Sequence, residues 1–283
     1  MKRTSLFAAI ALALSTALVA PLGATSLATS AAPLRGVAFT FDDGLSARGI
    51  REILAVAVAE RVPVTFFPTA NSLRKFPQLW REIAAAGFAI GNHTAGHRSL
   101  PRLYADGGRK AVVSAIRDWQ FQARATGIQT IPILRPPYGE RSAVTDAIAA
   151  SVGIDHVVNW SATFADTAPR CSGTIARRFA HATRGGEGTI VLGHTGAKGR
   201  AYEPLTARLF AQVIRSYQTR GITPVSLDVM FGGRKRTIDW TLAAAATSAP
   251  SQIGGPRVPT TTPTPYRAGD MHLSPGEVAG VCD

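Results

Sequence analysis

The chain has 283 residues, of which 46% are hydrophobic and 17% are charged, so it is long enough to bury one sizeable core. Its formal net charge is +13. No basic run or stripe of alternating basic and aromatic residues occurs, which excludes the usual pattern of a nucleic-acid-binding protein. Dispersed arginines suit contact with an anionic cell envelope or polysaccharide. A surface whose charge only keeps the protein soluble would have the same composition.

Residues 1–31 are typical of a secretory signal peptide with an open cleavage position. Lys2 and Arg3 precede the apolar run Leu6–Ala20, and small residues follow from Pro21 onward. Such a short run, followed by proline, indicates export rather than a membrane span. We therefore expect a secreted or envelope-associated protein whose mature form has no transmembrane segment.

Between Gly36 and Phe231, short apolar runs alternate with helical periodicity. The expected strands are Val37–Phe41, Val64–Pro68, Phe88–Gly91, Ile133–Arg135, His156–Trp160, Thr189–Leu192 and Thr223–Leu227. The expected helices lie around residues 50–58, 80–84, 112–123, a segment capped by Ser142, 175–179 and 205–217. This alternation predicts an α/β fold, a distorted seven-stranded (β/α) barrel, although an open doubly wound sheet has the same pattern.

Residues 237–283 differ in composition from the domain predicted over residues 32–236. The alanine-rich stretch Ala243–Ala249 and the Pro/Thr run Pro259–Pro265 predict a weakly ordered tail. The two cysteines are Cys171 and Cys282, and in an exported chain we expect them to pair. Two free thiols or a bridge between chains are the alternatives.

Polar clusters fall at or just after the ends of the expected strands, where α/β proteins build their sites. Asp42 and Asp43 are adjacent carboxylates, which repel each other unless a cation or a partner lies between them; a plain turn is the alternative. His93 and His97 are four residues apart, and one helical turn would let both imidazoles reach a single metal ion. Two surface histidines in a loop would have the same spacing.

Three further clusters are less informative individually. The prolines after Arg135 stiffen the loop Arg-Pro-Pro-Tyr-Gly, so that its guanidinium and a backbone N–H can be held in place; a rigid turn is the alternative. Asp166 follows the expected fifth strand and is an ordinary loop residue by itself. His194 ends a buried strand, where a single histidine is more often a structural, hydrogen-bonded residue.

Together, the five clusters resemble the polysaccharide deacetylase family, carbohydrate esterase family 4, which shares the homology domain of nodulation protein B. The resemblance runs from about Val37 to Phe231, with all five motifs in the family's order. Two departures occur in the fourth motif, where Thr163 replaces an aspartate and Thr167 replaces a tryptophan. The loss of the tryptophan removes one wall of the acetyl pocket. Leu45 also replaces a proline after the first motif.

The resemblance implies that Asp43, His93 and His97 bind one divalent metal ion. Zn²⁺ is the expected ion, and Co²⁺ or Ni²⁺ would suit the same donors. The ion would lower the pKa of a water molecule and polarise the acetamide carbonyl. Asp42 would be the general base, and Arg135 would hold it by a charge-assisted hydrogen bond.

The remaining motif residues would serve the substrate. The backbone N–H of Tyr138 would stabilise the oxyanion, and Leu192 would line the pocket for the acetyl methyl group. His194 would protonate the departing amine, oriented by Asp166.

The resemblance implies a monomeric enzyme that removes N-acetyl groups from a polymer containing N-acetylglucosamine, with peptidoglycan ahead of chitin. The alternatives are an O-acetyl esterase acting on xylan or another acetylated glycan, and a glycan-binding protein of the same fold with impaired catalysis.

Overall fold

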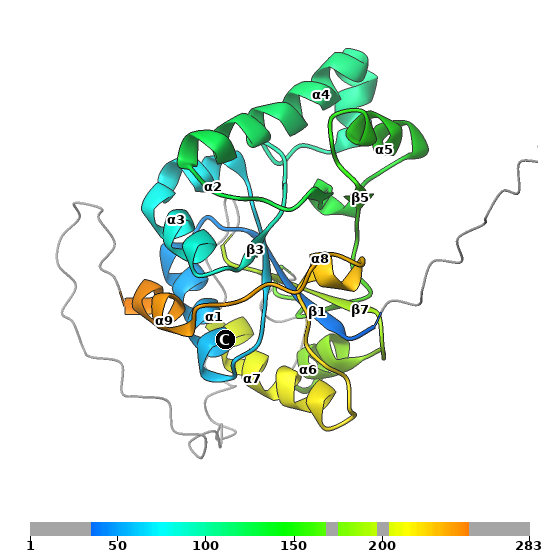
Figure 1. Cartoon of the computed structure of the whole chain (residues 1–283). Coiled ribbons are helices and arrows are strands. Elements are labelled where there is room, and N and C mark those ends of the chain that lie inside the picture. Colours follow the sequence, from blue (N-terminus) through cyan, green and yellow to red (C-terminus); the bar gives the residue numbers. More distant parts are fainter. Residues whose placement is uncertain (1–34, 168–174, 197–203, 249–283) are drawn as a thin grey trace, which may run out of the picture. The chain divides into compact units, whose positions relative to one another are not determined.

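Strand β1 (Val37–Asp43) lies at the centre of a five-stranded parallel sheet in the computed structural model (Figure 1). The sheet order is β3-β2-β1-β7-β6, and β4 pairs separately with β5. The other strands are β2 (Thr65–Pro68), β3 (Ala89–Ile90), β4 (Ile133–Leu134), β5 (His156–Val157), β6 (Ala162–Thr163) and β7 (Thr189–His194). The structure describes residues 35–167, 175–196 and 204–248. The predicted signal peptide, Cys171, Cys282 and the chain beyond residue 248 lie outside the described residues.

The strands follow one another around a distorted barrel. A single parallel bridge between Asn92 and Leu134 connects the end of β3 to β4, which gives the succession β5-β4-β3-β2-β1-β7-β6. Within the described ranges no hydrogen-bonded ladder joins β5 to β6, so the barrel is open there. This arrangement agrees with the predicted distorted (β/α) barrel.

One predicted strand is wrong, and another strand takes its place in the count. In the segment Thr223–Leu227, only Pro224 forms a bridge, to Val37, and Leu227 already begins the short helix α8 (Leu227–Met230). Proline cannot donate to a ladder, which limits the pairing. The additional strand is β6, whose two residues are too few to show a periodicity in the sequence.

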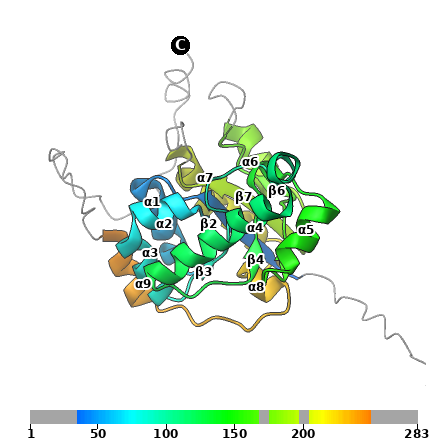
Figure 2. The same ribbon diagram turned by 90° about the horizontal axis from the view of Figure 1, so that it is seen from above.

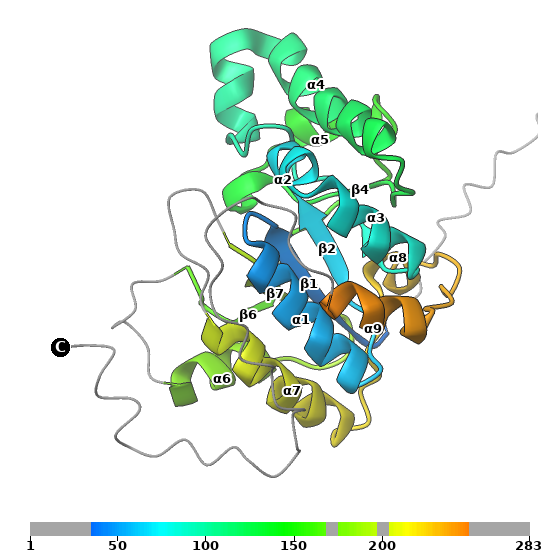
Figure 3. The ribbon, with the colours of Figure 1, turned by 90° about the vertical axis from the view of Figure 1, so that its left-hand side faces the viewer.

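Helices surround the strands (Figures 2 and 3). The predicted cap at Ser142 is confirmed, because its side chain accepts from the Thr145 amide. Gly127 ends α4 with a left-handed φ of 78°. Within the described residues no helix is long and apolar enough for a membrane span. The helices besides α8 and α9 are α1 (Ala47–Ala59), α2 (Ala70–Lys75), α3 (Pro77–Ala85), α4 (Leu100–Thr126), α5 (Ala143–Ala150), α6 (Ile175–Thr183) and α7 (Pro204–Gln218).

The domain extends beyond the predicted boundary at residue 236. The alanine-rich stretch expected in the tail forms helix α9 (Trp240–Ser248), which packs against α1 and α3 (Figure 3). Ala243 and Ala246 are buried, and the Trp240 ring meets Phe88 edge to face at 6.1 Å between centroids. Alanine has a high helix propensity and lets helices approach closely, so this stretch is a helix and not a tail.

The alternation of side chains along β1 separates the core from the site. Phe39 and Phe41 belong to the apolar layer under the helices, where both rings meet Phe210 of α7. Ala38, on the other face, belongs to an apolar cluster inside the barrel. Two and four residues further along the same face come Thr40 and Asp42. The barrel interior therefore changes from apolar to polar towards the carboxyl ends of the strands.

Candidate active site

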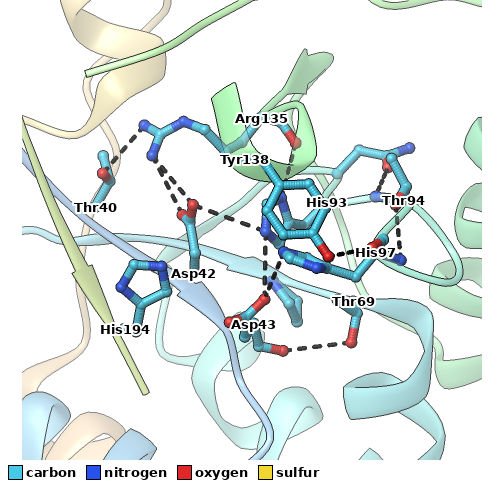
Figure 4. Close-up of polar contacts among 12 residues, drawn as sticks. Thr40, Asp42, Asp43, Thr69, His93, Thr94, His97, Arg135, Tyr138 and His194 are labelled. Atoms are coloured by element: carbon cyan, nitrogen blue, oxygen red, sulfur yellow. Dashed lines mark hydrogen bonds and ion pairs between the residues drawn. The ribbon is translucent and has the colours of Figure 1, made fainter. Parts of the chain in front are cut away.

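Asp43, His93 and His97 converge at the carboxyl end of β1 (Figure 4). The Asp43 Oδ1 atom lies 3.4 Å from His93 Nε2 and 3.2 Å from His97 Nε2. All three possible ligand atoms lie within 4.8 Å of one another. Asp43 and His93 are buried, and His97 is partly exposed. The structure thus brings together the three residues that the sequence analysis predicted as metal ligands.

The two histidines converge through a loop and not through the helical turn that their spacing suggested. Thr94 and His97 both have left-handed φ angles, of 63° and 52°. The Asn92 side chain accepts from the Thr94 amide, and the Thr94 hydroxyl accepts from the His97 amide. His93 Nδ1 lies 2.8 Å from the Arg135 carbonyl oxygen, which directs Nε2 towards Asp43.

The donor set and its protonation fit a divalent cation. Burial acts to raise the pKa of Asp43, but the hydrogen bond from His93 and the nearby histidine charges outweigh burial and lower it. Burial and the charge of His93 lower the pKa of His97. An ionised carboxylate and a neutral imidazole are the ligand forms that metals bind. A carboxylate with two imidazoles leaves a coordination position open, as in catalytic zinc sites.

The same cluster attracts positive charge. Burial acts to lower the pKa of His93, yet the charge of Asp42 and the contact with Asp43 raise it above its ordinary value. Two buried carboxylates beside one imidazole therefore favour a cation at this position.

Asp42 is held by Arg135 from across the barrel, as predicted. Arg135 Nη1 lies 3.3 Å from both carboxylate oxygens, and both side chains are buried. Arg135 also donates from Nη2 to the Thr40 hydroxyl at 3.1 Å and from Nε to the Val158 carbonyl at 3.0 Å. The sequence analysis missed Thr40, although its position two residues before Asp42 places it on the same face of β1.

His194 and Asp166 form the second predicted pair. His194 Nδ1 lies 2.8 Å from Asp166 Oδ1, and the His194 amide donates to Asp166 Oδ2 at 2.8 Å. Thr206 of α7, which the sequence analysis missed, donates to the same carboxylate at 2.9 Å. Burial acts to lower the pKa of His194, but the charge and hydrogen bond of Asp166 and the charges of Asp42 and Asp43 raise it to about 9. The imidazole is therefore protonated at neutral pH.

Tyr138 and Leu192 border this arrangement. Tyr138 has a φ of 61°, is 65% exposed and meets the His97 ring edge to face at 4.7 Å between centroids. Leu192 is buried on β7, two residues before His194 and on the same face of the strand. Their roles towards an oxyanion and an acetyl group stay predictions.

The altered fourth motif keeps a local turn. The Thr163 hydroxyl accepts from the Ala165 amide at 3.0 Å, and Ala165 adopts a left-handed φ of 51°. Thr163 thus supports the turn that leads to Asp166. Thr167 is exposed.

Backbone strain gathers around these residues. Among the described residues, all but one of the non-glycine residues with positive φ belong to the site or its turns; Arg61 is the exception. Such conformations cost roughly 1–3 kcal/mol each and persist at functional sites where the surrounding structure imposes them. The site members of this set are Asp43, Thr94, His97, Tyr138 and Ala165.

Three groups meet at this point: the metal-type cluster of Asp43, His93 and His97, the Asp42 carboxylate held by Arg135, and the protonated His194. This arrangement is typical of a hydrolase. The sequence profile of the family described as Polysaccharide deacetylase matches residues 30–157. A peptidoglycan-N-acetylglucosamine deacetylase of Bacillus cereus is 29% identical over 202 residues, which cover 69% of this chain and 68% of the relative. A chitooligosaccharide deacetylase of Bradyrhizobium is 32% identical over 163 residues, which cover 57% of this chain and 71% of the relative.

A solved structure has the same fold. The family 4 carbohydrate esterase from Streptomyces lividans, in complex with acetate, aligns with a TM-score of 0.60 at 23% identity, over 74% of this chain and 100% of that one. The chain belongs to the polysaccharide deacetylase family, carbohydrate esterase family 4. It is a hydrolase of the class that acts on carbon–nitrogen bonds other than peptide bonds.

Proposed function

We propose that this chain is an exported, metal-dependent deacetylase that hydrolyses N-acetyl groups of a polymer containing N-acetylglucosamine, with peptidoglycan ahead of chitin as the polymer. The observation that carries the proposal is the convergence of Asp43, His93 and His97 beside the Asp42–Arg135 pair. The named activities of the Bacillus and Bradyrhizobium relatives support the choice of an N-acetylated glycan.

In this proposal the three-residue cluster holds the ion, which when bound supplies a Lewis acid and lowers the pKa of water. Asp42 takes up the proton of the attacking water. Arg135 keeps the carboxylate of Asp42 in place, because its buried guanidinium contacts both carboxylate oxygens.

His194 serves as the proton donor to the departing amine. Its Nδ1 atom is engaged by Asp166, which leaves the other ring nitrogen for the substrate. A raised pKa keeps the donor proton on the ring at neutral pH, and it stays there until the C–N bond breaks. The products are acetate and a glucosamine residue with a free amine.

The test is acetate release by the purified, metal-loaded chain from chitooligosaccharides and from peptidoglycan glycan strands. Acetate should be released, release should stop with a strong chelator, and it should return when Zn²⁺, Co²⁺ or Ni²⁺ is added. Full activity of protein shown to be metal-free would contradict the metal dependence. No acetate from any N-acetylated glycan would contradict the proposed reaction.

A second candidate, an O-acetyl esterase of glycans, rests on the altered fourth motif with Thr163 and Thr167. Acetylated xylan in the same assay distinguishes it, because acetate would then come from xylan and not from chitooligosaccharides. Export is tested separately by sequencing the amino terminus of the protein collected outside the cell, which should begin near residue 32.

A further inference from the structure

A charged groove adjoins the metal-type cluster on the side of Tyr138. Its volume is about 470 Å³, and its lining includes His97 and Tyr138. A polymer whose acetamide lies at the cluster can therefore extend into the groove. The charged residues that line the groove are Arg98, Arg102, Asp106 and Glu140.

The first part of α4 forms one wall of the groove. Gly107 and Gly108 have non-helical dihedral angles and separate this short segment, with Arg102, from the rest of the helix. The segment begins directly after the loop that carries His97, and the Ser99 side chain caps it. Glu140 also lines the groove and comes directly after the turn that contains Tyr138. Arg102 and Glu140 thus lie on the segments that directly follow His97 and Tyr138.

The charges of the groove are only partly matched within it. Arg98 and Asp106 form an ion pair of 3.0 Å, and both side chains are mostly exposed. In the described part of the chain, the side chains of Arg102 and Glu140 make no ion pair or hydrogen bond. An arginine and a glutamate are therefore available to a ligand beside the reacting group.

Two considerations favour a carboxylate as the group that Arg102 receives. A guanidinium presents a planar pair of donors that matches a carboxylate. The chain also carries a net charge of +13, which steers anionic polymers towards it. Glu140 opposes the same ligand, so the two residues should affect its binding in opposite directions.

We propose that this groove, called here the Arg102 groove, is a subsite for the sugar next to the one that is deacetylated, and that Arg102 binds a carboxylate on that sugar. The inference rests on the proposed function and narrows its substrate class to glycans with free carboxylate substituents, such as N-acetylmuramic acid residues whose lactyl group carries no stem peptide.

The test compares two substrates that differ only in charge. One is an oligosaccharide of alternating N-acetylglucosamine and N-acetylmuramic acid, and the other is the same compound with each lactyl carboxylate converted to a methylamide. The measured quantity is the ratio of their kcat/KM values. The variants are Arg102→Gln, Glu140→Gln and the control Arg117→Gln, which removes an exposed arginine from the same helix outside the groove.

Arg102→Gln should lower the preference for the anionic substrate about three- to fivefold, the effect of one solvent-facing ion pair. Glu140→Gln should raise the preference, because it removes a repulsion. Arg102→Lys should keep part of it, and Arg117→Gln should leave it unchanged. High salt should reduce the wild-type preference and have little effect on the preference of Arg102→Gln.

Several outcomes would overturn the inference. An equal loss on both substrates would make Arg102 a structural residue, and unchanged ratios would exclude the groove from specificity. A higher preference for the anionic substrate in Arg102→Gln, together with a lower one in Glu140→Gln, would show that the groove receives a cationic group. Each of these outcomes leaves acetate release by the wild type intact, and the proposed function with it. No release from either substrate would overturn the proposed function itself.

Discussion

His194 and Asp42 are register partners on the neighbouring parallel strands β7 and β1. The sheet therefore places the proposed proton donor directly beside the proposed proton acceptor. Figure 4 shows Asp42 between His194 on one side and the Asp43–His93–His97 cluster on the other. The pairing of β1 with β7 thus places the proposed acid beside the proposed base, and the loop after β3 brings His93 and His97 to the other side.

The separation of base from metal ligands is testable with Asp42→Asn. Asp42 is not a member of the three-residue cluster, so the variant should keep its metal while kcat falls by roughly 10²–10⁴-fold. The matched change Asp43→Ala should lose both metal and activity. Elemental analysis per chain, with acetate release, measures the two effects. Loss of metal from Asp42→Asn would show that Asp42 is a ligand.

The raised pKa of His194 predicts a pH dependence. Its protonated form is present below a pKa of about 9, so activity should fall as the pH rises through that value. Asp166→Asn removes the largest contributions that raise the pKa and leaves burial, which lowers it, with the smaller raising effect of Asp42 and Asp43. The alkaline limb of kcat/KM should then move to lower pH. A bound cation would lower the pKa in both proteins, so the measured difference between them is decisive. Coincident profiles would contradict the role of Asp166.

The raised pKa of His194 also determines how the free energy of unfolding changes with pH. The folded pKa of His194 lies above its ordinary value of 6.5, so its contribution to the free energy of unfolding is complete below about pH 6.5 and is lost as pH rises through about 9. Denaturant titrations should show a free energy of unfolding that is higher for wild type than for Asp166→Asn near pH 6.5. This difference should shrink as the pH rises through about 9.

Thr40 is expected to stabilise the fold through Arg135. Its hydroxyl accepts from Arg135 Nη2 and donates to the Val191 carbonyl, and the residue is fully buried. Thr40→Val should lower the free energy of unfolding by about 1–3 kcal/mol, because it leaves a buried donor without its partner. Thr40→Ser keeps the hydroxyl and is the control. Equal urea midpoints for wild type and Thr40→Val would exclude this role.

Position 167 is expected to influence the choice of acyl group. Thr167→Trp should restore a wall to the acetyl pocket and change the relative rates on N-acetyl sugars and bulkier acyl esters. Thr167→Ala is the control for loss of the threonine alone. Identical relative rates in all three proteins would show that position 167 does not contact the acyl group.

Helix α9 is expected to belong to the folding unit. A chain that ends after Arg236 should lose on the order of 3 kcal/mol relative to one that ends after Ser248, because it exposes the apolar surface under Ala243, Ala246 and Trp240. Both chains lack Cys282, so a disulfide bond with Cys171 is absent from both. Equal thermal midpoints for the two chains would show that residues 237–248 do not contribute to the stability of the domain.

The alternation of strands and helices and the motif residues of the site could be read from the sequence, whereas the choice between a barrel and an open sheet could not. Apolar runs and helical stripes report which residues are buried, and these patterns located six of the strands and the helices from α1 to α7 other than α2. The motif residues Asp43, His93 and His97 each lie next to a strand end, where a parallel fold gathers its polar groups. Periodicity and motifs depend on residues that are close together in the chain, so they can be recognised in the sequence.

The groups that hold the motif residues in place could be found only from the folded arrangement. Thr40 and Arg135 are 95 residues apart in the chain, and Thr206 lies 40 residues after Asp166. An isolated threonine has no pattern that distinguishes such a partner from a surface residue. Helix α9 likewise depends on α1 and α3, because its alanines become a core face only against those helices. Contacts between distant segments arise from strand register and helix packing, which no local periodicity records.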